Sequence, residues 1–246
     1  MAAEFVHLHV HSQYSFLTST LKIPELVAGV KAQGMGAVAL TDHANLFGAV
    51  RFYKECERSG VTPILGAELN LVRSGSVNRV DHLVVLAASL EGYRNLVRLV
   101  TRSYTAPGSD EAPSVTLDQV GDCSAGLVAL TGCLNGVVAQ AVLEGGVDRA
   151  ESALAALRDR FEAGYLFVEL QDHGFPEQRV LNEVLVAAAG RLDLPVVATN
   201  DVHFASADDG EAQIYLDCIR KNTSYADERA AHHGSFAMYL KSPEAM

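Results

Sequence analysis

Short apolar runs alternate with longer amphipathic segments along most of the chain. Runs rich in β-branched residues and bounded by polar or turn residues are typical of buried strands. We therefore predict strands at residues 5–10, 37–41, 62–68, 82–88, 127–131, 165–171 and 195–199.

The segments between these runs have the apolar spacing of helices. Pro24 suits a first helical turn, and Gly34 suits the stop that follows Gln33. Residues 148–151 resemble a capping box and precede an apolar face made of Ala150, Leu154, Leu157 and Phe161. A second apolar face is made of Leu181, Leu185, Ala188 and Leu192. Residues 103–114, rich in Pro, Gly, Ser and acids, predict a loop.

The alternation of strands and helices predicts parallel strands joined by helical crossovers. With 246 residues, 49% of them hydrophobic, the chain can bury the core of one barrel-sized domain. We therefore expect an α/β fold whose sheet is a closed or nearly closed barrel.

Charge and composition exclude several classes of protein. The net charge of -11 argues against a nucleic-acid binder that relies on neutralising phosphates, although bound divalent cations would offset part of it. No apolar run approaches the roughly 20 residues of a membrane span, and the N-terminus lacks the basic start of a secretory signal. We expect a cytoplasmic protein that does not enter a membrane. The four cysteines form no C-x-x-C pair, so neither a zinc knuckle nor a disulfide framework is indicated.

The segment His7-Leu8-His9-Val10-His11 would place its histidines on one face of an extended strand. Later clusters of the same chemistry follow apolar runs, at Thr41-Asp42-His43, Gly66-Ala67-Glu68, Thr131-Gly132-Cys133 and Asn200-Asp201-Val202-His203. Because the carboxyl ends of barrel strands meet at one face, these clusters are expected to converge in one cleft. His82 is the exception, since it opens its strand, unless that strand runs against the others.

Such a set of His, carboxylate and thiolate is too large for one tetrahedral zinc, and a bridging carboxylate is typical of multinuclear hydrolases. Two ions can clamp a phosphate, lower the pKa of a bridging water and orient that water in line with the phosphorus. Asp42 and Asn200 are plausible second-layer supports for the ligands, and His7 is interpreted as support or structure. His173 could line the cleft or be solvated, whereas His232 and His233 are expected to be exposed; those three histidines are not assigned to the site.

Several motifs in order carry a resemblance to a known family. They are H-L-H-V-H-S-Q-Y-S, L-T-D-H-A-N-L-F-G-A, G-A-E, H-L-V-V-L-A, L-T-G-C-L, V-E-L-Q-D-H-G and V-A-T-N-D-V-H-F. Together they resemble the PHP (polymerase and histidinol phosphatase) domain, and more narrowly the N-terminal PHP domain of bacterial DNA polymerase III alpha subunits. The resemblance covers essentially the whole chain.

The resemblance implies a distorted seven-stranded barrel over residues 1–204, with residues 205–246 as a C-terminal segment of the same domain that leads towards an absent polymerase region. It also implies two to three divalent ions, zinc or manganese being favoured over magnesium or iron. The implied metal ligands are His9, His11, His43, Glu68, His82, Cys133, Asp201 and His203. Glu68 would bridge two ions, and Glu68, Asp201 and His203 are assigned to catalysis.

One position departs from the family pattern S-x-L-D-G. This chain has Thr18 where an aspartate ligand is expected. A neutral hydroxyl is a poor ligand for a divalent ion, so the third metal position is in doubt.

Two classes of function compete. The first is a metal-dependent phosphoesterase, with 3′-5′ exonuclease activity on DNA as a candidate and the remaining polymerase domains as partners. The second is a catalytically silent, metal-stabilised structural module of the polymerase. A free-standing phosphatase for a small ester is a third reading. Lys241-Ser242-Pro243-Glu244 resembles the start of a helix, which suggests a longer parent protein, while the oligomeric state stays open.

Overall fold

The structure is a computed structural model that describes residues 5–72, 80–105, 112–231 and 236–246. Its helices are α1 (Ile23–Ala32), α2 (Ala49–Ser59), α3 (Leu90–Thr105), α4 (Leu117–Gly121), α5 (Val137–Arg158), α6 (Pro176–Leu192), α7 (Gly210–Lys221), α8 (Tyr225–Ala231) and the 3-10 turn η1 (Ala207–Asp209). Its strands are β1 (Ala37–Leu40), β2 (Thr62–Val72), β3 (Val80–Ala87), β4 (Leu127–Leu130), β5 (Leu166–Leu170) and β6 (Val196–Ala198).

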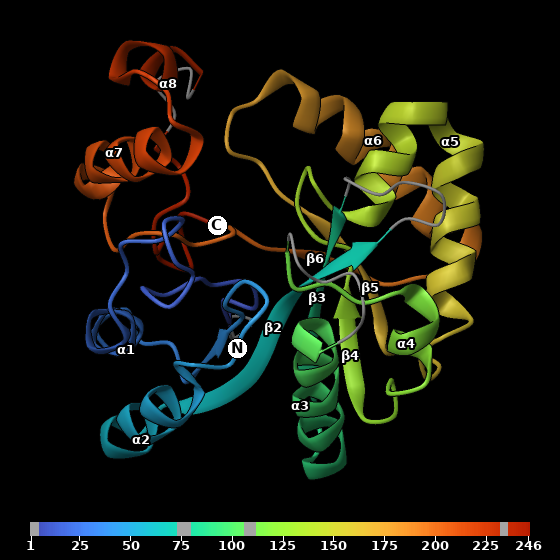
Figure 1. The fold of residues 1–246 in the computed structure, drawn as a ribbon, viewed down its shortest axis with the longest axis horizontal. Helices are drawn as coiled ribbons and strands as arrows, with labels where there is room; N and C mark the ends of the chain where they lie inside the picture. The colour runs from blue at the N-terminus through green and yellow to red at the C-terminus, as the bar shows by residue number, and fades with distance from the viewer. Residues whose placement is uncertain (1–4, 73–79, 106–111, 232–235) are drawn as a thin grey trace.

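The strands form one six-stranded sheet in the order β1-β2-β3-β4-β5-β6. The sheet curls on itself, and the helices lie around its outside (Figure 1). Three pairs are parallel, namely β1 with β2, β4 with β5 and β5 with β6, and each of these pairs is joined by a helix. The α/β class expected from the alternation of strands and helices is therefore confirmed.

The expectation that all strands run parallel is wrong for β3. This strand pairs antiparallel with both β2 and β4. Only residues 73–79 separate β2 from β3, and a parallel crossover needs a dozen or more residues. The reversal places the first residues of β3 beside the last residues of its neighbours.

The seventh predicted strand, residues 5–10, is reduced to a single bridge between Val10 and Val202. The segment still hydrogen-bonds to both sides, because Thr41 N–H donates to the Val10 carbonyl and His11 N–H donates to the Val202 carbonyl. The ladder cannot extend, since Asp201 has a left-handed backbone with φ of 45° that bends the chain after β6. Within the residues that the structure describes, the sheet thus has six strands, and the expected seventh is not confirmed.

Helix boundaries differ from the sequence prediction where glycine intervenes. The first helix is confirmed, with Gln33 at its C-cap and Gly34 at φ 73°. Helix α5 begins earlier than predicted and bends at Gly145 and Gly146, just before the expected capping box. The predicted loop at 103–114 partly lies outside the described residues, and α3 reaches into it as far as Thr105.

Side-chain alternation along the strands separates two faces of the sheet. In β2, Ala67 and Leu69 belong to the main core beneath the helices, whereas Glu68 between them faces the other way. In β3, Val85 joins the same core, and Val84 belongs to a small cluster on the opposite face. The inner face of the curled sheet therefore carries Glu68 as well as the small apolar cluster that includes Val84.

The C-terminal residues return to the start of the chain. Leu240 packs with α1 in a second core, and the Leu240 carbonyl accepts a hydrogen bond from Gln33. Residues 242–246 form turns in place of the helix suggested by the sequence. Among the described helices, none is both long and apolar enough to cross a bilayer.

Two helical glycines have opposite surroundings and give a matched stability test. A methyl group on Gly92 of α3 would overlap the carbonyl oxygen of Gly126, whereas Gly190 of α6 has open space around it. We expect Gly92→Ala to lower the free energy of unfolding by about 1–3 kcal/mol through overpacking. Gly190→Ala should raise it by about 0.5–1 kcal/mol, because alanine favours a helix. Urea unfolding measures the free energy of unfolding of each variant. Equal changes in the two variants would contradict the packing described.

Candidate metal centre

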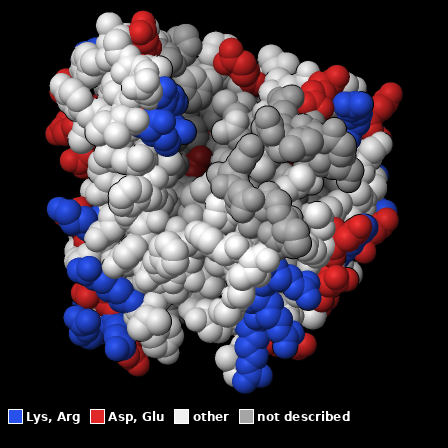
Figure 2. Space-filling model, in the orientation of Figure 1, with Lys and Arg blue, Asp and Glu red and all other residues white. Residues whose placement is uncertain are grey.

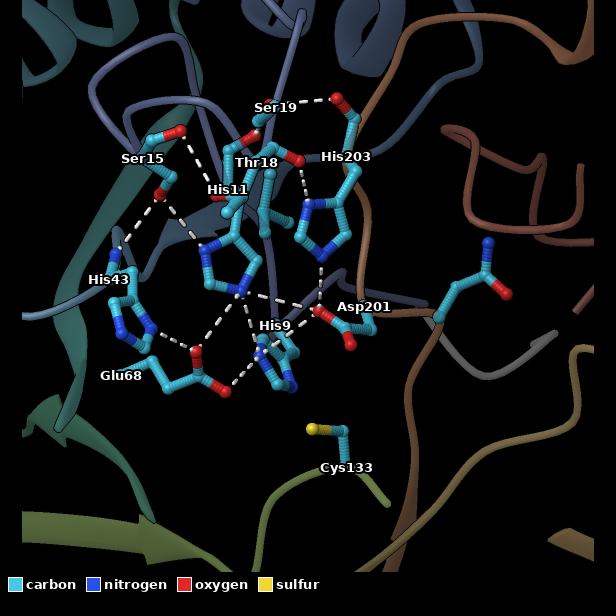
Figure 3. Close-up of polar contacts among 12 residues, drawn as sticks. His9, His11, Ser15, Thr18, Ser19, His43, Glu68, Cys133, Asp201 and His203 are labelled. Carbon is cyan, nitrogen blue, oxygen red and sulfur yellow. Dashed lines mark hydrogen bonds and ion pairs between the residues drawn. The ribbon is translucent and has the colours of Figure 1, made fainter. Parts of the chain in front are cut away.

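The eight ligands implied by the sequence resemblance come from six parts of the chain and meet at one end of the sheet. Their elements are the segment before α1 (His9, His11), the turn after β1 (His43), β2 (Glu68), β3 (His82), the turn after β4 (Cys133) and the turn after β6 (Asp201, His203). Figure 3 shows most of them pointing toward a common centre. The antiparallel course of β3 explains why His82, at the start of its strand, joins them.

The first group of side chains is His9, His11 and Asp201, all buried. The distance between His9 Nε2 and His11 Nε2 is 3.1 Å. Asp201 Oδ1 lies 3.2 Å from His9 Nε2 and 3.3 Å from His11 Nε2. His203 Nε2 reaches the same oxygen at 3.1 Å. Three imidazole nitrogens thus surround one carboxylate oxygen.

The other ring nitrogen of each of these histidines is already engaged. His203 Nδ1 donates to the Thr18 carbonyl at 2.6 Å. His9 Nδ1 donates to Glu169 at 2.7 Å, since a carboxylate only accepts. His11 Nδ1 donates to Ser15 Oγ at 3.0 Å, because that hydroxyl gives its own proton to Asp42.

A ring in its neutral form carries one N–H, so in that form these three contacts leave Nε2 as an acceptor on each histidine. The three lone pairs are directed at Asp201 Oδ1, which is also an acceptor. Acceptors that face one another need a cation between them, either a proton or a metal ion.

The second group is His43, Glu68 and His82. His43 Nδ1 lies 2.7 Å from Glu68 Oε2, and His82 Nδ1 lies 2.9 Å from Glu68 Oε1. The same carboxylate also approaches the first group, at 3.5 Å from His9 Nε2. Glu68 therefore lies between the two groups, which is the position of a bridging ligand.

Electrostatics favour charged carboxylates at this centre. Burial alone would raise the pKa of Glu68, but His82 and the other histidines hold it well below its ordinary value. Burial likewise opposes ionisation of Asp201, yet His9 and His203 hold its pKa well below the usual range. Burial raises the pKa of the Cys133 thiol well above its ordinary value, so without a cation nearby Cys133 stays protonated.

The spacing of the first group fits a metal ion. Two ligand atoms at about 2.0–2.1 Å from a tetrahedral zinc are about 3.3–3.4 Å apart. The distances of 3.1–3.3 Å among His9, His11 and Asp201 are close to this value. A donor set of nitrogen and carboxylate oxygen suits zinc, manganese or iron. Cys133 Sγ lies 3.7 Å from His82 Nδ1, beside the second group.

Glu169 of β5 is the residue that the site prediction missed. Its side chain is fully buried and accepts hydrogen bonds from His9 Nδ1, Gly132 N–H, Gln171 and Thr199. A buried carboxylate with four donors fixes the ring of His9 and its tautomer. The signal was present in the sequence, because a lone acid in the apolar run 165–171 needs a partner.

The supporting residues are only partly as expected. Asp42 supports the centre as predicted, since it accepts from Ser12 and from Ser15, which holds His11. The Asn200 side chain donates to the carbonyls of Ala237 and Tyr239, so these hydrogen bonds tie it to the C-terminal residues and not to a ligand.

The remaining histidines of the sequence prediction have other places. His7 donates to the Lys241 carbonyl, in agreement with a structural role. His173 is buried between Gln178 and the Asn200 carbonyl, so it is not solvated. His232 and His233 lie outside the described residues.

Thr18 contacts the centre through its backbone. Its carbonyl accepts from His203, whereas its hydroxyl donates to the Ser15 carbonyl at 3.0 Å. The hydroxyl is thus engaged within its own turn, and a third metal position stays a prediction.

Comparison with known proteins identifies the family of this chain. The sequence model of the PHP domain matches residues 7–173. The chain belongs to the PHP domain family. The DNA polymerase III alpha subunits of Treponema pallidum and Thermus aquaticus are each 37% identical to this PHP chain, over 98% and 99% of it. An error-prone DNA polymerase of Symbiobacterium thermophilum is 35% identical over 98%.

The PHP chain spans about a fifth of the length of these curated relatives, 21% of the first two and 23% of the third. Among solved structures, a proposed metal-dependent phosphoesterase from Bifidobacterium adolescentis has a TM-score of 0.51 at 16% identity, covering 82% of this chain and 88% of its own. An amidohydrolase from Chromobacterium violaceum, solved with sulfate and no metal, has a TM-score of 0.55 at 15% identity, covering 80% and 87%. At such identities the likeness supports the fold.

Metal content is the first property to measure at this centre. We expect two divalent ions per PHP chain by elemental analysis of the purified protein. Removing them with a chelator should lower the melting temperature, because ions bound only by the folded state add their binding free energy to folding. A metal-free protein that melts at the same temperature would contradict the ligand geometry.

Glu169→Gln tests the support of His9. The amide replaces one acceptor oxygen with a donor, which opposes the N–H groups of His9 and Gly132. We expect metal affinity to fall about 10–100-fold, as measured by competition with a chromogenic chelator. The exposed Glu183 of α6 provides the control, and Glu183→Gln should leave affinity as it is. Unchanged affinity in both variants would remove Glu169 from the centre.

Proposed function

We propose that this chain is a metal-dependent phosphoesterase that hydrolyses phosphodiesters of DNA, and that it forms the PHP part of a bacterial replicative polymerase alpha subunit. A 3′-5′ exonuclease that trims or proofreads DNA is the specific form we favour. The observation that carries the proposal is the arrangement of acceptors: three Nε2 atoms converge on Asp201, and Glu68 lies between that group and His43 with His82. Protons on the rings or metal ions between the ligand atoms would satisfy these acceptors, and the proposal takes metal ions.

The ligand set proposed is the one implied by the sequence. His9, His11, Asp201 and His203 would hold ions on one side of Glu68; His43, His82 and Cys133 would hold ions on the other. When bound, divalent ions would supply Lewis acidity, a lowered pKa of water and charge neutralisation for a phosphoester. The chain itself contributes orientation, because Glu169, Ser15 and the Thr18 carbonyl fix three of the imidazole rings.

Phosphoester hydrolysis suits this chemistry better than other metal reactions. Imidazole and carboxylate ligands suit zinc or manganese, and two ions beside one carboxylate can clamp both the attacking and the leaving oxygen. Support at the family level comes from the proposed metal-dependent phosphoesterase with a similar fold. The DNA substrate is proposed from the names of the polymerase relatives.

A catalytically silent module is the second candidate. It is favoured by Thr18, which replaces an expected carboxylate, and by the net charge of -11, which repels a polyanion. In that case the ions would serve folding alone. The two candidates predict the same metal content, but only the phosphoesterase predicts hydrolysis of a phosphoester.

Glu68→Gln separates these candidates. The substitution keeps the shape of the side chain and removes the charge that both groups share. If the chain is a phosphoesterase, we expect the rate of hydrolysis of single-stranded DNA to fall by at least about 100-fold. The reason is that the carboxylate between the two groups of ligands loses the negative charge that would help to hold the ions.

The matched control is Glu91→Gln, an exposed acid at the start of α3, which should keep the full rate. Circular dichroism establishes that both variants fold. Wild-type protein that is loaded with two ions and hydrolyses neither single-stranded DNA nor an aryl phosphate would favour the silent module.

A further inference from the structure

A cavity of about 660 Å³ lies directly beside the metal centre. Its wall includes His43, whose side chain is 32% exposed and whose Nδ1 contacts Glu68 at 2.7 Å. Thr18, whose carbonyl holds His203, lines the same cavity. The volume is in the range of small-molecule sites, and the wall is continuous with residues of the centre. In the space-filling view, an acidic group is visible inside a recess near the middle of the face (Figure 2).

Aromatic side chains are concentrated at this cavity. In the part of the chain that the structure describes, the well-exposed aromatic residues are Phe16, Phe47, Tyr53, Tyr104 and Tyr215. Three of them, Phe16, Phe47 and Tyr104, line this cavity. Phe16 is 84% exposed and Phe47 is 69% exposed, so these rings are left in water at a hydrophobic cost. Large rings held exposed around a hollow are typical of a binding site.

Two of the rings come from turns that also build the metal centre, and the third comes from α3. Phe16 belongs to the turn that includes Ser15, Phe47 follows the turn of His43, and Tyr104 lies in the last turn of α3. The rings of Phe47 and Tyr104 are near each other, with centroids 6.5 Å apart and planes inclined at 46°. A flat ligand can therefore stack on either ring inside a cavity whose wall also includes His43.

Hydrogen-bonding groups lie beneath the same wall. Asn70, only 3% exposed, donates Nδ2 to the Pro113 carbonyl and leaves Oδ1 without a partner among the described residues. The Gln13 side-chain oxygen is likewise buried without a described partner. Both residues line the cavity. Rotation of either amide would offer an acceptor to the N–H groups of a bound molecule.

We infer that this cavity binds the base of the last nucleotide of single-stranded DNA, with Phe47 and Tyr104 as stacking surfaces and with the adjoining phosphodiester directed to the metal centre. The inference rests on the proposed phosphoesterase function, and it adds a substrate class: single strands with a base at the end. Stacking on aromatic rings accepts every base, because each has a π face. A chain with a net charge of -11 does not attract a DNA strand by its overall charge, so stacking on the rings and contact with bound ions would have to supply the affinity. A duplex end cannot stack there until its last base is unpaired.

The test measures binding of a fluorescent oligothymidylate to the 246-residue chain by anisotropy, with manganese and with chelator. A phosphorothioate at the last linkage slows hydrolysis during the measurement. A matched oligonucleotide lacks only the base at its 3′ end. We expect the wild-type protein to bind the complete strand about tenfold more tightly than the abasic strand.

Phe47→Ala and Tyr104→Ala should reduce this preference towards onefold. The control is Tyr53→Ala, because Tyr53 is 48% exposed and Tyr104 is 46% exposed, yet Tyr53 does not line the cavity. Tyr53→Ala should retain the full preference. All three side chains are exposed, and circular dichroism checks that each variant folds.

No preference in the wild-type protein, no saturable binding, or a preference that survives both cavity variants would overturn the base site. Hydrolysis of the unmodified strand is followed separately. Hydrolysis without a base preference would leave the phosphoesterase standing and remove the base site. A base preference that both cavity variants abolish, in a protein that does not hydrolyse DNA, would support the base site and remove the phosphoesterase.

Discussion

The contact between buried carboxylates and inward-facing histidines is the interaction on which the rest of the structure depends. Glu68 is 3% exposed and Asp201 is 7% exposed, so both charges have lost most of their hydration. An unpaired buried charge costs several kcal/mol, whereas a charge that is paired and hydrogen-bonded can be tolerated. Histidines on all sides provide that pairing, and their outer N–H groups are anchored in turn. The centre is therefore a stability requirement as well as a site for chemistry.

The fold meets this requirement by joining distant segments of the chain. β1 and β6 are the edges of the sheet, and residues 7–11 hydrogen-bond to the turns or strands that adjoin both edges. The reversed β3 brings His82 to the same end as the turns after β1, β4 and β6. The left-handed backbone of Asp201 bends the chain after β6, at the point where the Asp201 carboxylate meets His9 and His11. A strained backbone at a functional residue is tolerated because the surrounding contacts hold it in place.

The same geometry connects the two proposals. An ion held between Glu68 and its histidines would bind the phosphate of a strand and stabilise charge in a transition state. The exposed rings around the adjoining cavity would bind the base, which the ions cannot recognise. Separating recognition of the phosphate from recognition of the base would allow a chain with a net charge of -11 to bind a polyanion.

The sequence by itself determined that the chain alternates strands and helices and which polar side chains follow the apolar runs. His9, His11, Glu68, Asp201 and their companions follow apolar runs, and local periodicity is enough to find such runs. Whether a strand runs parallel, however, depends on its partners, so the reversal of β3 and the loss of residues 5–10 as a strand were decided by tertiary structure. Glu169 was overlooked for the same reason. The apolar run around it shows that this acid needs a partner, but only the tertiary structure shows that the partner is His9. Local pattern fixes which side chains face inward, whereas long-range pairing decides which of them meet.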